Sequence, residues 1–324
     1  MFKLIGKALG ILLALIIVFV AATSILALTR WKRTFASPMP GIHASADSAV
    51  VAHGRQLAYG DAACVTCHVT KDELLQVREG AMPPLAGGQL FEFPLGKFYT
   101  PNLTPDGETG IGRYSDGELA RVLRNSVRPD GRAVLPFMEY HNVSDDDLTA
   151  LISFLRSQEP VRREVPAHQP SMLGKAVFAF AIKPIGPTGT PPASSPSGLS
   201  VERGAYLASN LSACVGCHTS RNHMDGAAIS LPFAGGMKFP DETDPTATFV
   251  SPNLTPATDT PFAGWDENRF VDRFRSGVGL PNSPMPWRSY QRMSEDDIRS
   301  IFRYLRTLEP SNVPIGPTYL KGEA

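Results

Sequence analysis

The chain opens with a continuous apolar segment and then alternates between apolar and polar residues. Residues 9–28 carry no charge and consist mainly of Leu, Ile, Val and Ala. About 20 helical residues, rising about 1.5 Å each, cross a bilayer core of about 30 Å. A cleaved signal peptide is the alternative, but its apolar region usually has about 7–15 residues, and no small-residue cleavage site follows here. Residues 1–33 are therefore predicted to form an uncleaved, single-pass membrane anchor.

Beyond the anchor, helical periodicity is clearest in two segments, SDDDLTALISFLRSQEP from Ser144 and SEDDIRSIFRYLRTLEP from Ser294. Apolar residues in both recur at i, i+3, i+4 and i+7, which is typical of a half-buried helix. Each serine is expected to cap its helix, and Asp147 or Asp297 to complete a carboxylate version of the capping box. The proline at the end of each segment closes the helix.

These segments belong to a longer internal repeat. VAHGRQLAYGDAACVTCHVT from position 51 corresponds without a gap to VERGAYLASNLSACVGCHTS from position 201, and FYTPNLTPD corresponds to FVSPNLTPA. One unit has been duplicated, and the copies are predicted to be two tandem domains, residues 46–160 and 199–312. Equivalent aromatic residues on the capped helices are expected to meet small residues on another helix: Phe154 with Gly54, and Tyr304 with Gly204.

The segment between the repeats, residues 161–198, is rich in Pro, Gly and Ser and is predicted to be a linker, because it cannot bury enough apolar surface for a core. One apolar island, residues 172–182, interrupts it. The island is too short to span a membrane. It is expected to pack across the two domains, with a membrane-surface or partner contact as the alternative.

Composition narrows the fold class and the partners. The 31 basic and 31 acidic side chains cancel, so no basic field favours binding to nucleic acid. The 28 glycines and 29 prolines, together with scarce strand-like alternation, predict short helices separated by ordered loops. The expected fold is therefore all-α.

All four cysteines lie in two copies of one pentapeptide, Cys64-Val65-Thr66-Cys67-His68 and Cys214-Val215-Gly216-Cys217-His218. C-x-x-C-H is the attachment pattern of c-type haem. The thiols at i and i+3 share a helix face, so they can add to the two haem vinyl groups and leave the adjacent imidazole under the iron. The chain is predicted to carry two covalently attached haems, with His68 and His218 as iron ligands.

Three other uses of these cysteines fit the pattern less well. Structural zinc prefers four soft ligands, whereas each copy offers two Cys and one His. A redox-active dithiol would be expected after a buried strand in a βαβ unit, and neither copy follows one. A disulfide within one helical turn would constrain almost nothing.

Methionine is the expected second axial ligand of each iron, since its thioether suits haem iron and raises the potential. Met285, in Ser-Pro-Met-Pro-Trp, lies nine residues before the cap Ser294. The corresponding position in the first repeat is Leu135, which cannot ligate. Met138 lies three residues later in the same loop and is the predicted ligand, with Met82 as the alternative.

The histidines outside the two motifs compete for the same role. His53, His141 and His223 have no duplicated equivalents, so they are expected to lie at the surface or to support other groups. The iron-binding imidazoles are expected to donate their second N–H to a backbone carbonyl. Pro84 and Pro232, in the matching segments that end in Ala-Gly-Gly, are the candidates for those carbonyls.

Each unit resembles a class I cytochrome c domain, with C-x-x-C-H near its start, a methionine loop, and a final helix ending in Leu-Arg-Ser or Leu-Arg-Thr. TPNLTPDGETGIGRYSDGELARVLRNSVRPDGR, followed by LPFMEY, is similar to the cytochrome subunits of membrane-bound alcohol and gluconate dehydrogenases. Those subunits typically carry three haems, whereas this chain has two motifs. The resemblance implies the following site residues: Cys64, Cys67, Cys214 and Cys217 for haem attachment, His68 and His218 as proximal ligands, and Met138 and Met285 as distal ligands.

The expected function is electron transfer, not catalysis. A dehydrogenase or quinol-oxidising complex would deliver electrons, and an oxidase or soluble cytochrome would collect them. Because c-type haem is attached outside the cytoplasm, the N-terminus is placed in the cytoplasm, the anchor in the inner membrane and the domains in the periplasm. The alternative is a dihaem enzyme of the peroxidase or thiosulfate dehydrogenase type, which needs an iron with an open site. A redox sensor would need an output domain, and no segment remains for one.

Overall fold

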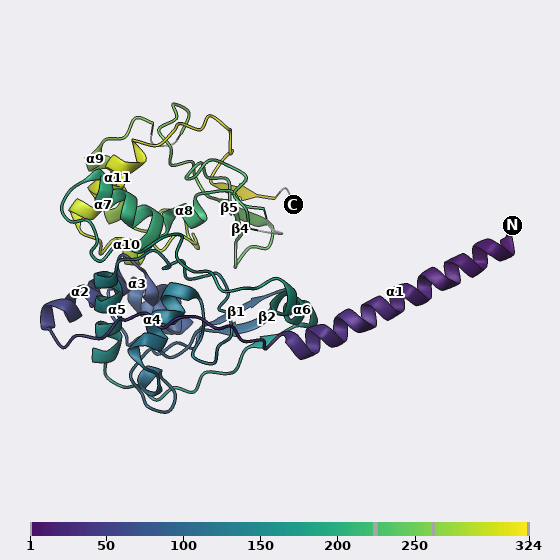
Figure 1. Cartoon of the computed structure of the whole chain (residues 1–324). Helices are drawn as coiled ribbons and strands as arrows, with labels where there is room; N and C mark the ends of the chain where they lie inside the picture. The colour runs from purple at the N-terminus through teal and green to yellow at the C-terminus, as the bar shows by residue number, and fades with distance from the viewer. Residues whose placement is uncertain (1, 223–225, 261–262, 323–324) are drawn as a thin grey trace.

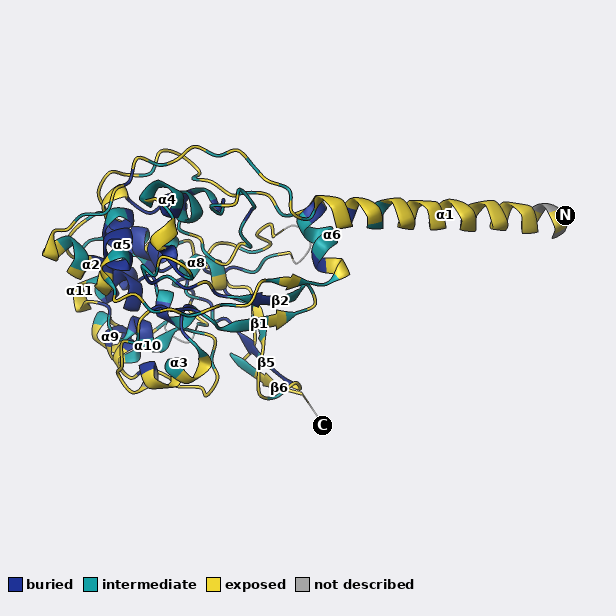
Figure 2. Cartoon of the chain, turned by 90° about the horizontal axis from the view of Figure 1, so that it is seen from below, coloured by how far each residue is buried: buried dark blue, intermediate teal, exposed yellow. Residues whose placement is uncertain are grey.

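The structure is a computed structural model that describes residues 2–222, 226–260 and 263–322. One long helix, α1 (Phe2–Arg30), projects from a body of two lobes (Figure 1). Ile5–Arg30 is long and apolar enough to cross a membrane, and its side chains are almost all exposed. Figure 2 shows this exposure along nearly the whole helix. The predicted apolar helix is present, with bounds close to those expected.

The first lobe contains the elements of the first repeat. Its helices are α2 (Ser48–Tyr59), a 3₁₀ turn at Cys64–Thr66, α3 (Lys71–Arg78), a 3₁₀ turn at Ile111–Arg113, α4 (Asp116–Asn125) and α5 (Asp145–Ser157). Helices α2 and α5 pack closely on each other. The turn that contains the first cysteine motif follows α2 directly, so this helix pair sets its position.

The second lobe repeats this plan. Its helices are α7 (Val201–Tyr206), a π-helical turn at Leu207–Leu211, α8 (Cys214–Cys217), α9 (Glu267–Arg275), α10 (Trp287–Tyr290) and α11 (Glu295–Leu305). Helices α7 and α11 pack as α2 and α5 do. Each repeat therefore places a cysteine motif directly after the first helix of a packed pair.

Both expected glycine contacts are present. A Cβ on Gly54 would lie 1.8 Å from the Ala150 carbonyl oxygen and 2.8 Å from Cβ of Phe154. A Cβ on Gly204 would lie 1.9 Å from the Ser300 carbonyl oxygen and 2.9 Å from Cβ of Tyr304. The helices of each pair approach so closely that only glycine fits at the crossing.

The serine caps are confirmed, but the reciprocal half of each capping box is wrong. Ser144 accepts a hydrogen bond from the backbone N–H of Asp147 (3.2 Å), and the corresponding contact at Ser294 is 3.0 Å. The Asp147 carboxylate does not turn back to its cap. It contacts His53 and Tyr206 instead, each at 2.6 Å. An aspartate at this position is thus used to join helices, whereas longer glutamates complete the boxes that begin α3 and α4.

The fold is mostly helical, but the all-α expectation is incomplete because the described residues also contain two small antiparallel sheets. The first has the order β1 (Leu90–Phe93), β2 (Gly96–Tyr99), β3 (Gln169–Pro170), and the second β4 (Lys238–Pro240), β5 (Ala247–Val250), β6 (Tyr319–Lys321). Their strands have two to four residues, too few for visible alternation. The third strand of each sheet follows the last helix of its repeat, so the equivalence extends beyond the predicted repeats.

The apolar island after the first repeat is a helix, α6 (Met172–Phe180), and the expectation that it packs across the two domains is wrong. It packs on the end of α1, where Ala27 and Ala179 are buried (Figure 1). Gly174 lies against the Leu95 carbonyl oxygen, next to the β2–β3 pairing. Strand β3 fixes the start of α6 on the first lobe, and this directs the helix towards the anchor.

Residues of both lobes form one continuous hydrophobic core, with α5 and α11 among its most buried elements (Figure 2). A polar contact also joins the lobes: Tyr206 donates to the Asp147 carboxylate and accepts the backbone N–H of Ser144 at 3.0 Å. In the opposite direction, Gln56 donates to the Arg292 carbonyl oxygen at 2.6 Å. The two repeats are thus packed together, and their division into independent domains stays a prediction.

Candidate functional site

Each cysteine motif begins from a turn with unusual backbone geometry. Ala63 and Ala213, directly before Cys64 and Cys214, have φ of 51° and 48°. Left-handed backbone disfavours residues with a Cβ, and it persists only where the surroundings enforce it. Its recurrence at equivalent positions shows that both copies of the motif are held in the same defined turn.

Two equivalent tyrosines hold these turns in place. Tyr140 donates to the Ala62 carbonyl oxygen at 2.5 Å, and Tyr290 donates to the Ser212 carbonyl oxygen at 2.7 Å. Burial raises the pKa of both phenols well above the usual value, so they remain donors. Each tyrosine closely follows a candidate methionine, Tyr140 after Met138 and Tyr290, the last residue of α10, after Met285. The methionine loop and the cysteine turn of each repeat are therefore tied together.

The motif histidines are buried and supported by the backbone. Nδ1 of His68 donates to the Pro101 carbonyl oxygen at 3.1 Å, and Nδ1 of His218 donates to the Pro252 carbonyl oxygen at 2.9 Å. Burial lowers the pKa of His68 to about 4 and lowers that of His218. Both imidazoles are therefore neutral, with the Nε2 lone pair available to a metal.

The predicted source of these carbonyls was wrong. Pro84 and Pro232 were expected, but the carbonyls belong to Pro101 and Pro252, the first prolines of the repeated Pro-Asn-Leu-Thr-Pro sequences. The Ala-Gly-Gly segments contact the backbone of the histidines and not their imidazoles. Gly87 and Gly235 donate their backbone N–H groups to the carbonyl oxygens of the two histidines, at 2.9 and 2.8 Å.

The asparagine that follows each of these prolines holds the loop in place through its side chain. The Asn102 side chain donates to the Val161 carbonyl oxygen (2.8 Å) and accepts from the backbone N–H of Thr104 (2.9 Å). Asn253 does the same with Ser311 and Thr255, at 2.7 and 2.9 Å. The duplicated segments FYTPNLTPD and FVSPNLTPA are the sequence signal for these residues, although repetition alone does not indicate which groups the asparagines hold.

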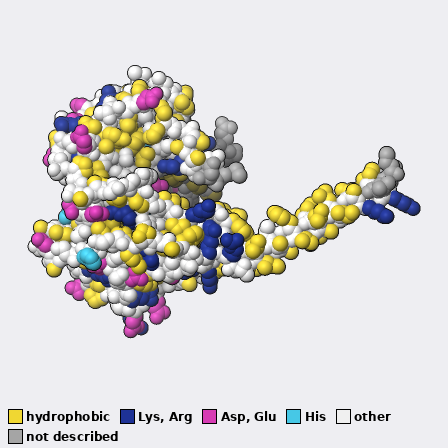
Figure 3. Space-filling model, viewed as in Figure 1, with side chains coloured by type: hydrophobic (Ala, Val, Ile, Leu, Met, Phe, Trp, Pro, Cys, Tyr) yellow, Lys and Arg dark blue, Asp and Glu magenta, His cyan; other side chains and the backbone are white. Residues whose placement is uncertain are grey.

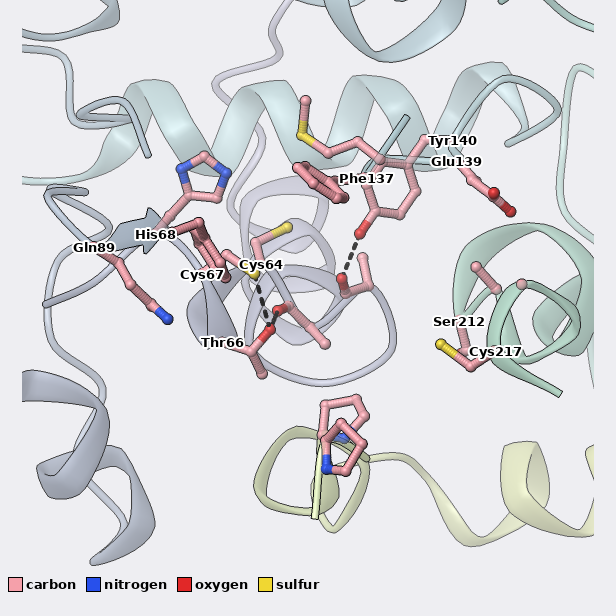
Figure 4. A pocket seen from close by; sticks show the side chains of 18 of the residues that line it. Cys64, Thr66, Cys67, His68, Gln89, Phe137, Glu139, Tyr140, Ser212 and Cys217 are labelled. Carbon is pink, nitrogen blue, oxygen red and sulfur yellow. Dashed lines mark hydrogen bonds between the residues drawn. The ribbon is translucent and has the colours of Figure 1, made fainter. Parts of the chain in front are cut away.

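Both cysteine motifs face one continuous cavity of about 2390 Å³. Figure 4 shows Cys64, Cys67 and His68 around part of this space, with Tyr140 and Glu139 between them and Cys217. The lining also includes Met138 and many apolar side chains. The structure therefore places both cysteine pairs, both motif histidines and the two predicted methionine ligands on the wall of one cavity.

The surroundings of the thiols are unlike those that the competing uses need. All four cysteines are free, and burial raises the pKa of Cys64 and Cys214 to about 12. A redox-active dithiol needs the opposite shift, because its nucleophile is the thiolate. Among the described residues, no three or more His, Cys, Asp or Glu side chains lie together in a way that could hold a metal ion, which is the arrangement that a structural zinc site needs.

The methionine loops of the two repeats have the same backbone turn but different side chains. The N–H of Phe137 donates to the Leu135 carbonyl oxygen, and the N–H of Trp287 donates to the Met285 carbonyl oxygen, both at 2.7 Å. Leu135 thus occupies the position of Met285. Met138 and Met285 line the cavity, whereas Leu135 is not among the residues that line it.

The other candidate ligands point elsewhere. Met82 is 43% exposed and lies outside the cavity lining. His53 pairs with Asp147, and Nδ1 of His141 donates to the Arg124 carbonyl oxygen at 3.3 Å. Neither histidine lines the cavity. The third candidate, His223, lies outside the described residues.

The lining fits two haem groups attached through thioethers. Each repeat supplies two thiols on one turn, a neutral imidazole supported at Nδ1, and a loop whose methionine also lines the cavity. The cavity is apolar and large, and its two cysteine motifs lie at different places on its wall. Taken together, these features are those expected of a c-type cytochrome site.

Known proteins with similar sequences agree with this class. The chain is 30% identical over 308 residues to one of the subunits of nicotinate dehydrogenase from Pseudomonas putida, covering 90% of this chain and 24% of that protein. It is 30% identical over 285 residues to the cytochrome c subunit of alcohol dehydrogenase (quinone) of Gluconobacter oxydans, covering 81% of this chain and 55% of that protein. No family model matches the chain.

A third relative is nearer in length. The diheme cytochrome c-type protein of Cereibacter sphaeroides is 27% identical over 257 residues, covering 75% of this chain and 81% of that protein. The resemblance to the cytochrome c subunits of alcohol and gluconate dehydrogenases is confirmed at about 30% identity over most of the chain. The chain spans about a quarter of the first relative and about half of the second.

Proposed function

We propose that this protein is a membrane-anchored dihaem cytochrome c that transfers electrons from a dehydrogenase or quinol-oxidising complex to an oxidase or soluble cytochrome. The single observation that carries the proposal is the duplicated arrangement of thiol pair and neutral, carbonyl-supported imidazole on one apolar cavity. Relatives named as cytochrome c subunits support a dehydrogenase as donor and a non-catalytic role.

In this proposal, each repeat binds one haem. The haem supplies an iron that gains and loses one electron. Cys64 and Cys67 would hold the first haem covalently, and Cys214 and Cys217 the second. The two buried histidines, together with Met138 and Met285, would supply the ligands of the two irons. Pro101 and Pro252 orient the imidazoles, and the apolar lining would exclude water from the bound haems.

The proposed topology has the haem-binding body in the periplasm. The helix α1 would cross the inner membrane once, with its N-terminus in the cytoplasm. Support comes from the cysteine motifs, because covalent haem attachment takes place outside the cytoplasm, and from the 26-residue apolar helix. The proposed domain limits are residues 46–160 and 199–312, joined by residues 161–198.

Replacement of the methionines tests the proposal. Met285→His should lower the potential of one haem, and Met138→His that of the other, because imidazole lacks the potential-raising effect of a thioether. Met82→His is the matched control, since that side chain is exposed outside the cavity, and it should shift neither potential. Spectroelectrochemical titration of the three full-length variants measures these shifts. An unchanged titration in Met285→His would remove Met285 as a ligand.

One observation favours a second candidate, a dihaem enzyme of the peroxidase or thiosulfate dehydrogenase type. Leu135 replaces the repeat equivalent of Met285, so an iron in the first repeat could keep an open position if Met138 does not bind. Near-infrared absorption of the oxidised protein distinguishes the candidates. Fe–S(Met) bands from both haems support the electron carrier, and a band from the second repeat alone, with turnover of peroxide or thiosulfate, supports the enzyme.

A further inference from the structure

The helix α6 has an apolar surface that the body of the protein leaves uncovered. Met172, Leu173 and Phe180 are 51%, 56% and 46% exposed. The opposite side of the helix is fixed by contacts: Gly174 and Ala179 are buried, and α6 packs on α1. The exposed apolar surface of α6 is therefore held in one orientation and is continuous with the apolar surface of the anchor.

The position of α6 along the axis of the anchor helix α1 is also defined. Residues of both helices surround a small cavity, with Thr23, Ser24 and Ala27 from α1 and Met172, Ala176 and Phe180 from α6. The uncharged part of α1 ends at Leu28. Thr23 lies about 7.5 Å below that end at about 1.5 Å per residue. Interfacial helices bury their apolar face about 5–10 Å into the boundary between headgroups and acyl chains, which is this depth.

Basic side chains surround the region where α6 packs on the end of α1. Lys32 and Lys183 are exposed, Lys175 lies on α6 itself, and Arg33 donates to the Ile182 carbonyl oxygen at 2.6 Å, which fixes the end of this segment. The sequence contains no acidic residue before Asp47, and none from residue 165 to residue 201. In Figure 3, basic side chains gather where the long helix meets the body.

A turn of the first lobe adds to this group. Thr34 forms a β-bridge with Arg132, and Phe35 donates its N–H to the Gly131 carbonyl oxygen at 2.8 Å. Asp130, the acidic residue of that turn, is paired with Arg132 at 2.6 Å. The charge of the juxtamembrane segment and α6 is therefore not neutralised by the turn that packs against it.

We propose that α6 is an interfacial helix, seated in the same bilayer that α1 crosses, and that the basic residues around it bind anionic phospholipid headgroups. This inference rests on the proposed anchor and adds to it a second membrane contact. One transmembrane helix alone would let the body rotate and tilt freely. The second contact fixes one face of the first lobe towards the membrane. Trp31 and Lys32, which line the haem cavity, would then lie at the membrane surface.

Photo-crosslinking to lipid tests this inference. The full-length holoprotein, with p-benzoylphenylalanine in place of Leu173, is inserted into nanodiscs of equal phosphatidylglycerol and phosphatidylcholine. A second probe replaces Met172, so that a folding defect at one site does not decide the result. Val313, which is 67% exposed in the other lobe, carries the control probe. We expect lipid adducts by mass spectrometry at Leu173 and Met172, and none at Val313.

The headgroup part of the inference has its own readout. Phosphatidylglycerol should exceed phosphatidylcholine among the adducts, and the double variant Lys175→Gln, Lys183→Gln should return the ratio to that of the bilayer. Equal adducts in the parent protein would overturn the anionic preference. Absence of lipid adducts at both α6 probes would overturn the interfacial helix. Failure of the chain to enter nanodiscs would instead overturn the anchor, and an unaltered haem spectrum would show that the haem sites are unaffected.

Discussion

At the scale of single residues, two glycines determine how closely the helices behind each cysteine motif can approach. The hypothetical Cβ positions at Gly54 and Gly204 overlap backbone carbonyl oxygens, and backbone cannot move aside as a flexible side chain can. This feature was predictable from the sequence, because the repeat placed each glycine opposite an aromatic residue on the capped helix. The helix pair in turn holds the turn that carries the cysteines.

Gly54→Ala should therefore destabilise the protein by about 1–3 kcal/mol or more, since the added methyl forces α2 and α5 apart. Gly189→Ala is the matched control, because no atom lies within 4 Å of its hypothetical Cβ, and its effect should stay within about 0.5 kcal/mol. Chemical unfolding followed by far-ultraviolet circular dichroism gives both values. Equal stability of the two variants would show that the crossing is not tight.

A residue-scale ion pair also supports His68. Arg163 contacts the Glu73 carboxylate with two nitrogens, at 2.7 and 2.9 Å, and donates to the Gly87 carbonyl oxygen at 3.1 Å. Gly87 in turn donates to the His68 carbonyl oxygen. The hydrogen bonds from Arg163 lower the pKa of Glu73 from 4.5 to about 2. This pair therefore links the segment after the first repeat to the motif histidine.

The stabilisation from this pair should depend on pH with a defined sign. Because the pKa of Glu73 is lower in the folded protein, its contribution is present above about pH 4.5 and is lost as the pH falls towards about 2. Arg163→Gln should cost about 1 kcal/mol at neutral pH. The difference in free energy of unfolding between Arg163→Gln and the parent protein should shrink as the pH falls from about 4.5 towards about 2. Arg162→Gln, which removes an exposed pair with Glu108, should change unfolding curves little at any pH.

At the scale of elements, the sequence predicted the helices better than the loops. Helix limits follow from caps and apolar spacing, which are local, and the serine caps of α5 and α11 were found where expected. The carbonyls that orient the histidines come from more than 30 residues away. Proximity of that kind is decided by packing, which is why position in a shared motif pointed to Pro84 and Pro232 and not to Pro101 and Pro252.

Loosening the loop that holds one proline carbonyl should change the reduction potential of one haem alone. Asn253→Ala removes the bonds to Ser311 and Thr255 that fix the Pro252 carbonyl oxygen. A weaker Nδ1–H···O bond makes the imidazole a poorer donor to iron, so the potential of the second haem should rise. Asn102→Ala is the matched variant and should shift the first haem instead. A redox titration that shifts the same haem in both variants would contradict the pairing of loops and haems.

At the scale of the whole molecule, the duplicated units do not use their equivalent residues in equivalent ways. Tyr206 joins the lobes through Asp147 and Ser144, whereas its repeat equivalent, Gln56, contacts the Arg292 carbonyl oxygen. Sequence repetition predicts that two units share a fold, but it carries no information on how they dock. For the same reason the contact of α6 with the anchor was not predicted, although the helix itself was evident as an apolar island.

Tyr206→Phe should weaken the contact between the lobes. It removes a partner from the Asp147 carboxylate, which is 1% exposed, and from the N–H of Ser144, and a buried group left without its partner costs about 1–3 kcal/mol. Tyr304→Phe is the control, because the first repeat has Phe154 at that position, and it should be nearly neutral. Thermal unfolding should show a lower midpoint in Tyr206→Phe alone. An equal loss in both variants would contradict a specific role for Tyr206.

Covalent binding of two haems is the central claim, and the intact mass of the full-length protein tests it most directly. Mass spectrometry under denaturing conditions should find the polypeptide with the added mass of two haems, and peptide mapping should place one on Cys64 and Cys67 and the other on Cys214 and Cys217. A polypeptide without added tetrapyrrole mass, isolated from cells that mature other c-type cytochromes, would contradict the claim.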